Sequence, residues 1–184
     1  MTEKLLELIQ SCGVTRAAAV SPNEVVYNAA FRDICAQNTC GLYGACHMCP
    51  PSIGPVEELM EKAKQYTVCL MYQNVFDIED SFDIEGMLDA KQTHHQRAQR
   101  IQQKMRELVN EPFLHLEAGG CGICARCAKR DGQPCRFPDK ALSSLEGYGI
   151  DVYHTAAHAG LRYINGQNTV TYFGMLFLQE KDHA

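Results

Sequence analysis

Four cysteines in the second half of the chain constrain its folding more than any other feature. Cys121, Cys124 and Cys127 stand three residues apart, and Cys135 follows after seven intervening residues. This spacing curls the backbone tightly enough for three sulfurs to converge on one small object. An iron–sulfur cube fits that requirement, because each of its irons takes one thiolate. We expect a four-iron, four-sulfide [4Fe-4S] cluster here, with Cys135 as the fourth ligand at this site or at another.

Zinc ligation and disulfide bonding are also compatible with these four cysteines. The run is similar to the C-x2-C-x2-C-x3-C-P run of bacterial ferredoxins, but its last gap is longer and Pro138 comes three residues after Cys135. Structural zinc is the first alternative, since Cys124 and Cys127 can form one knuckle of a tetrahedral site. A disulfide framework is the second, and it requires an oxidising compartment.

A second group of cysteines lies in the first half of the chain. Gaps of four, five and two residues separate its members, which are Cys35, Cys40, Cys46 and Cys49. Glycines at 41 and 44 and the pair Pro50-Pro51 favour an irregular but stiff loop around them. Four cysteines within fifteen positions favour metal ligation over a turn with buried free thiols. The sequence therefore allows one or two iron–sulfur clusters.

Charge and hydropathy exclude two classes of function. The net charge is −5 and no long basic stretch occurs, so the electrostatic footprint of nucleic-acid binding is missing. No apolar run approaches the roughly 20 residues of a membrane span. The first residues, Met1 to Glu7, carry acids where a signal peptide has a basic start. We expect a cytoplasmic protein whose ten cysteines are ligands or reactive thiols.

Hydrophobic periodicity predicts an α+β fold of one compact domain over residues 1–184, with a mixed or antiparallel sheet covered by helices. The expected strands are Arg16–Val20, Thr67–Tyr72, Phe113–Glu117 and a C-terminal hairpin of Leu161–Ile164 with Val170–Leu178. The expected helices are one capped by Thr2, one from Pro55, Met87–Glu111, a short one at Leu142–Glu146 and one capped by Asp151. The two cysteine loops are expected at one end of the sheet.

Several residues near these elements are candidates for proton transfer. The apolar seam of the long helix contains Lys91 and His94, and His95 lies beside it. A histidine at such a place is more often a hydrogen-bonded core residue than a catalytic one. The acid–base candidates for an enzyme are Tyr43, His47, His94 and Glu146.

These motifs resemble a bacterial and archaeal family of predicted metal-binding proteins of unknown function. The resemblance runs from about Val20 to Leu178. It rests on Cys35, Cys40-Gly-Leu-Tyr-Gly44, Cys49-Pro-Pro51, Cys121-x2-Cys124-x2-Cys127, Cys135-Arg-x-Pro138, Ser144-Leu-Glu146 and Gly149-Ile-Asp-Val152. It implies metal binding, through one or two iron–sulfur clusters, and no particular reaction. Two departures stand out, because Cys46 and Ser143 occupy positions where the family favours other residues.

Three functions are compatible with the sequence. The first is electron transfer or a redox accessory role, with a redox partner protein or a small molecule as partner. The second is an enzyme with an open iron site, which arises if Cys46 or Cys35 is not a ligand and one cluster keeps only three cysteines. The third is a zinc-stabilised interaction module. The motifs of S-adenosylmethionine radical chemistry and of phosphate-binding loops are absent. The sequence leaves the oligomeric state open.

Overall fold

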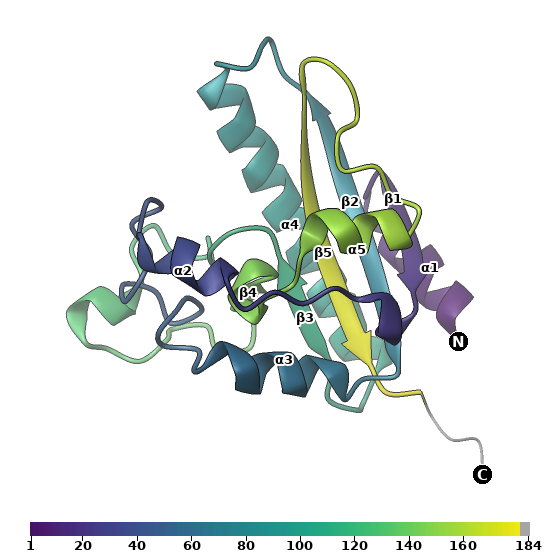
Figure 1. Ribbon diagram of the computed structural model, residues 1–184, viewed down its shortest axis with the longest axis horizontal. Helices are drawn as coiled ribbons and strands as arrows, with labels where there is room; N and C mark the ends of the chain where they lie inside the picture. Colours follow the sequence, from purple (N-terminus) through teal and green to yellow (C-terminus); the bar gives the residue numbers. More distant parts are fainter. Residues whose placement is uncertain (181–184) are drawn as a thin grey trace.

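A mixed five-stranded sheet forms the centre of the molecule (Figure 1). The computed structural model describes residues 1–180. The strands are β1 Arg16–Val20, β2 Val68–Asp77, β3 Leu114–Glu117, β4 Ser143–Ser144 and β5 Thr169–Leu178. Their order across the sheet is β1-β2-β5-β3-β4, and only the β3–β4 pair is parallel. The expected α+β class with a mixed sheet is confirmed.

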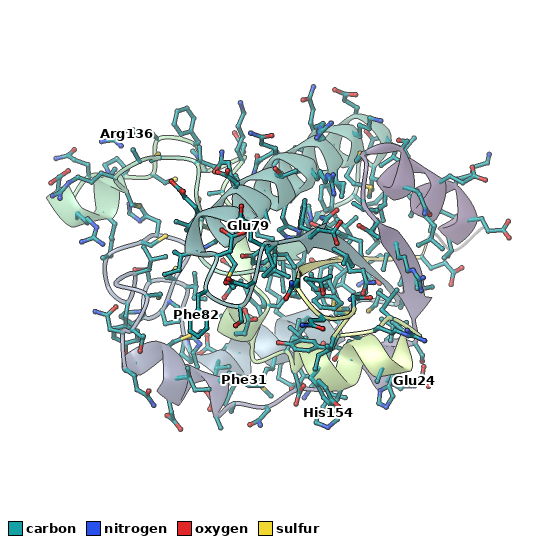
Figure 2. All side chains as sticks on the ribbon, turned by 90° about the horizontal axis from the view of Figure 1, so that it is seen from above. Glu24, Phe31, Glu79, Phe82, Arg136 and His154 are labelled. Atoms are coloured by element: carbon teal, nitrogen blue, oxygen red, sulfur yellow. The ribbon has the colours of Figure 1, made fainter. Side chains whose placement is uncertain are left out.

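Helices cover both faces of the sheet. In Figure 2, viewed from above, the helices lie in two groups on opposite sides of the sheet. The first pair is α1 Thr2–Ser11 and α4 Ile84–Leu108. The second group is α2 Phe31–Ala36, α3 Val56–Lys64 and α5 Val152–His158. Short 3-10 helices complete the described chain: η1 Pro22–Glu24, η2 Ala128–Asp131 and η3 Glu146–Tyr148.

The period-two alternation of β2 divides the core into two layers. Leu70 and Tyr72 are buried among residues of α1 and α4, whereas Cys69 and Met71 are buried among residues of α3 and α5. Successive side chains of a strand point to opposite faces, so a strand buried on both faces reads as one continuous apolar run. Cys69 belongs to this core as expected, and burial raises the pKa of its thiol to about 12.

A buried polar chain joins the sheet to α4. The Tyr72 hydroxyl donates to His115 Nε2 at 2.9 Å, and His115 Nδ1 donates to Gln102 Oε1 at 3.0 Å. Asn74 Nδ2 donates to His94 Nδ1 at 2.8 Å. His94 is therefore a hydrogen-bonded core residue, packed against the rings of Tyr72 and Tyr172.

Two of the expected elements are wrong. Residues 161–164 form no strand, because β5 pairs along its whole length with β2, from Thr169 opposite Asp77 to Leu178 opposite Val68. The short helix at Leu142–Glu146 is instead strand β4 followed by η3. Serine is a weak helix former, and this segment contains two. The Leu145 N–H donates to the Glu117 carbonyl of β3 instead of to a helical partner.

Several helix boundaries also differ from expectation. Met1, not Thr2, precedes the first helical residue, and no side chain caps α1. The long helix begins at Ile84, where the Asp83 carboxylate accepts the Gly86 N–H at 2.8 Å, and it ends at Leu108. Helix α2 was not predicted. It has no side-chain cap and no buried residue, so neither of the usual sequence signals marks it.

The expected cap of α5 is present and can be tested. Asp151 Oδ1 accepts the backbone N–H of His154 at 3.0 Å. We expect Asp151→Ala to lower the free energy of unfolding by about 1 kcal/mol, the usual cost of losing an N-cap. Urea denaturation measures this. Asp151→Asn keeps an acceptor oxygen and is expected to cost only a few tenths of a kcal/mol. An equal loss in both variants would mean that charge, not capping, is responsible.

Candidate metal centre

Two loops that are distant in sequence lie together at one end of the sheet. One runs from α2 to α3 and the other from β3 to β4, and both views show them side by side, with Arg136 at the outer edge (Figures 1 and 2). Arg130 Nη2 donates to the Gly41 carbonyl at 2.7 Å, and His47 Nε2 donates to the Gln133 carbonyl at 2.8 Å. These bonds connect the two loops directly.

Five cysteines line a small, partly open cavity between the loops. Its volume is about 20 Å³. The cysteines that line it are Cys46, Cys121, Cys124, Cys127 and Cys135. The other lining residues are His47, Met48, Ile123, Phe137 and Ala141. The whole second group of cysteines therefore meets one member of the first group here. We call this the enclosed site.

The other three cysteines line a larger and more open cavity of about 310 Å³. They are Cys35, Cys40 and Cys49, and they share the cavity with Lys91, Gly119, Gly120, Ser144 and Glu146. The remaining lining residues are Ile34, Thr39, Leu42, Tyr43 and Pro50. The structure thus divides the eight candidate cysteines into five and three, although sequence proximity suggested four and four. We call this the open site.

The two sites share a wall made by the turn from Cys46 to Cys49. The Cys49 N–H donates to the Cys46 carbonyl at 3.3 Å, and only 1% of Cys46 and 7% of Cys49 are exposed. Their thiols are hydrogen-bonded to one another, which lowers the pKa of Cys46 and raises that of Cys49. Cys46 also accepts the Met48 N–H at 3.4 Å and contacts the Cys127 thiol. The Cys46 sulfur therefore accepts hydrogen bonds from several neighbouring groups.

Gly120 allows the loops to approach one another at this wall. A Cβ at this position would collide with Leu42 Cδ1 and lie 3.1 Å from Cys49 Sγ. Only a residue without a side chain lets the backbone pass so close to the sulfur. Gly120 therefore lets the second loop pack directly against Leu42 and Cys49 of the first loop.

The protonation state of the buried thiols is compatible with metal binding. Burial raises the pKa of Cys121 to about 11, so this thiol stays protonated at neutral pH unless a cation binds. A coordinating metal deprotonates a thiol outright and compensates the buried charge. The donor set of five sulfurs at one site and three at the other therefore fits thiolate ligation of a soft metal.

The basic residues of the second loop hold that loop together. Arg126 Nη2 forms an ion pair with Asp131 Oδ1 at 2.7 Å, and Arg136 Nη1 donates to the Arg126 carbonyl at 3.1 Å. Together with the Arg130 bond to Gly41, these contacts shape the loop around the enclosed site.

The acid–base candidates are spread over three places. Tyr43 and Glu146 line the open site, His47 lines the enclosed site, and His94 lines neither. Burial, the main effect, raises the pKa of Glu146, while bonds from its own N–H and the Ser144 hydroxyl oppose the rise.

Sequence reasoning missed two charged groups beside the cysteines. Lys91 lines the open site, although the sequence indicated only its place on the helix seam. Glu117 Oε1 pairs with His95 Nδ1 at 2.8 Å, and its buried Oε2 has no partner among residues 1–180. A Cβ on Gly122 would lie 3.9 Å from the His95 ring, so this pair lies against the second cysteine loop. The sequence did offer one signal for Glu117, because this residue stands only four positions before Cys121.

All ten cysteines are free thiols, and within residues 1–180 no three His, Cys, Asp or Glu side chains converge to hold a single ion. Residues 18–178 match the family described as "Predicted metal-binding protein (DUF2284)". The chain belongs to this family. The match includes both cysteine groups, which accords with the resemblance found in the sequence.

No curated protein and no solved structure shows significant similarity to this DUF2284 protein. Its family supports metal binding without specifying the metal. No helix within residues 1–180 has the length and apolar character needed to cross a membrane.

Proposed function

We propose that this DUF2284 protein is an iron–sulfur protein that transfers electrons. The enclosed site is the redox centre, with Cys121, Cys124, Cys127 and Cys135 as ligands. The observation that supports this proposal is that these four residues, which share one short loop, all line one cavity. The cavity of about 20 Å³ has room for about one water molecule, so a four-iron cluster would require the two loops to lie further apart. Such a cluster would supply reversible one-electron chemistry.

Iron is favoured over a single zinc ion by the way the sulfurs are spread. Tetrahedral zinc holds its sulfurs about 2.3 Å away, which brings them to within about 3.8 Å of one another. In residues 1–180 no three metal-binding side chains converge on one ion, and five cysteines, one more than tetrahedral zinc uses, line the enclosed site. In a cluster each thiolate binds a different iron, so the ligands do not have to meet at one point.

A second candidate function is supported by the division of the first cysteine group. Cys46 faces the enclosed site, so three thiols, Cys35, Cys40 and Cys49, remain at the open site. Three thiolates leave one position of a four-iron cluster without a protein ligand. An open position is what catalytic metal sites offer to a substrate. We propose that the open site binds a small molecule at such a cluster.

The partners follow from this proposal. The enclosed site exchanges electrons with a redox protein or with the molecule in the open site, because the two sites share the wall made by Cys46 and Cys49. A cytoplasmic location is part of the proposal, since a reducing compartment keeps ten cysteines available as ligands.

Iron and acid-labile sulfide analysis of anaerobically purified protein tests the proposal. We expect roughly eight irons and eight sulfides per chain if both sites hold four-iron clusters. The protein should be brown, and paramagnetic resonance of the reduced form should show two signals. A colourless protein with stoichiometric zinc would contradict the redox function, and four irons would restrict it to one site.

A further inference from the structure

The open site carries charged groups that no thiolate ligand requires. We infer that it binds a small carboxylate bearing an adjacent hydroxyl or amino group, with Lys91 binding the carboxylate and Glu146 binding the second group. This inference rests on the proposed open site and specifies the class of molecule that enters it.

Lys91 supplies an unused positive charge. Its ammonium reaches from α4 to the second cysteine loop, because a Cβ on Gly119 would lie 3.2 Å from Lys91 Nζ. Among residues 1–180 it makes no hydrogen bond and no ion pair. Burial raises the pKa of Glu117, and the hydrogen bond from His95 and the charges of His95 and Lys91 oppose that rise. The ion pair of Glu117 is with His95 and not with Lys91. A half-buried ammonium with free donors is the feature that binds an anion.

Glu146 supplies a hydrogen-bonding group that is fixed in place. It begins η3, and the Arg32 side chain of α2 donates to the Gly147 carbonyl at 3.0 Å and to the Gly54 carbonyl at 2.8 Å. These bonds hold η3 against the helix that carries Cys35. The carboxyl thus belongs to a rigid wall of the cavity, which is what positioning a bound hydroxyl or amino group requires.

The charge and size of the cavity limit the ligand. One ammonium and one carboxyl group suit a ligand with a single carboxylate and a nearby donor, whereas Glu146 repels a dianion such as phosphate. The cavity of about 310 Å³ lies at the lower end for small-molecule sites, and the proposed cluster takes up part of it, so only a short ligand fits. Ile34, Leu42 and Pro50 provide apolar contacts for a short carbon chain.

Calorimetric titration of the anaerobically purified full chain tests this inference, with lactate, alanine, propionate, lactamide and inorganic phosphate as probes. We expect lactate or alanine to bind more tightly than propionate, which lacks the second group. Lactamide, which lacks the charge, and phosphate should bind weakly. Lactate should also shift the paramagnetic resonance signal of the open site and leave that of the enclosed site unchanged.

Two variants assign the groups. Lys91→Gln should weaken binding of the preferred probe about ten- to a hundredfold, the range for a lost charge-assisted bond. Glu146→Gln should reduce the preference for lactate or alanine over propionate. Lys62→Gln, at an exposed position of α3, is the matched control and should change neither quantity. Equal affinity of wild type and Lys91→Gln, or binding of lactamide as tight as that of lactate, would overturn the inference.

Iron analysis separates this inference from the proposed function. If Cys35→Ser/Cys40→Ser/Cys49→Ser retains the wild-type iron content, the proposed cluster at the open site is wrong. If the iron content falls in that variant but wild type and Lys91→Gln bind the probes alike, the cluster proposal stands and the carboxylate inference fails. Each variant is therefore assayed for iron before titration.

Discussion

Cys124→Ser is expected to lower the iron content by one whole cluster, roughly four irons per chain. Cys124 lies in the middle of the second cysteine group and lines the enclosed site. Replacing one thiolate by a hydroxyl leaves an iron with a poor ligand. The paramagnetic resonance signal of the enclosed site should disappear, while the signal of the open site remains. Metal analysis and spectroscopy of the anaerobic protein measure both changes.

Cys46→Ser provides the contrast. Its sulfur also lines the enclosed site, but it is hydrogen-bonded to the Cys49 and Cys127 thiols and to the Met48 N–H. If Cys46 is a neighbour and not a ligand, the serine variant keeps its iron and shows only a shifted signal. Cys69→Ala, in the core, controls for the loss of a cysteine elsewhere. Loss of iron in Cys46→Ser with full retention in Cys135→Ser would exchange the roles of these two residues.

Acid is expected to destabilise the protein strongly below about pH 6.5. Burial, above all, lowers the pKa of both His94 and His115 to about 3. In the unfolded chain each histidine takes up a proton near pH 6.5, whereas in the native state both histidines stay neutral at that pH. The unfolded state therefore gains protons as pH falls. The free energy of unfolding should fall by up to about 4 kcal/mol between pH 7 and pH 5 for the two residues together.

Neighbouring charges modify this effect. The charges of His95, Arg97 and Lys91 add to the effect of burial and further disfavour the charged form of His94, whereas a hydrogen bond with the Phe173 backbone opposes them. Glu117 and Glu146 act in the opposite direction, because burial raises their pKa values and the native state takes up their protons first. Urea denaturation across this pH range, without oxygen, gives the slope.

Two histidine variants identify the source of the slope. His115→Gln, which can keep the bonds to Tyr72 and Gln102, should remove about half of it. His158→Gln, at an exposed position, should leave it unchanged. An unchanged slope in His115→Gln would show that His115 is not a source of the acid sensitivity.

The fold was predictable where one segment carried its own signal. The apolar run at β2 and the seam of α4 mark buried faces without reference to the rest of the chain. The hairpin prediction failed because β5 is paired with β2, about a hundred residues away, and not with its sequence neighbour. Local turn signals such as Asn165-Gly166 cannot show such a competitor.

The candidate site was predictable in its members and not in its division. Cysteine spacing marked all eight cysteines that line the two cavities. It could not show that Cys46 lines the enclosed site and Cys49 the open site. The position of Lys91 at the open site could not be predicted either, because its place beside Gly119 depends on how α4 packs over the second loop.

The central position of β5 has a consequence for how the protein matures. This strand is the last element of the described chain, yet it lies between β2 and β3 and joins the two halves of the sheet. Until it has been synthesised and inserted, the cysteine loops that precede and follow α4 in the sequence have no common scaffold. Both loops leave the ribosome as separate thiol-bearing segments, so the proposed cluster would be delivered only after the sheet has closed.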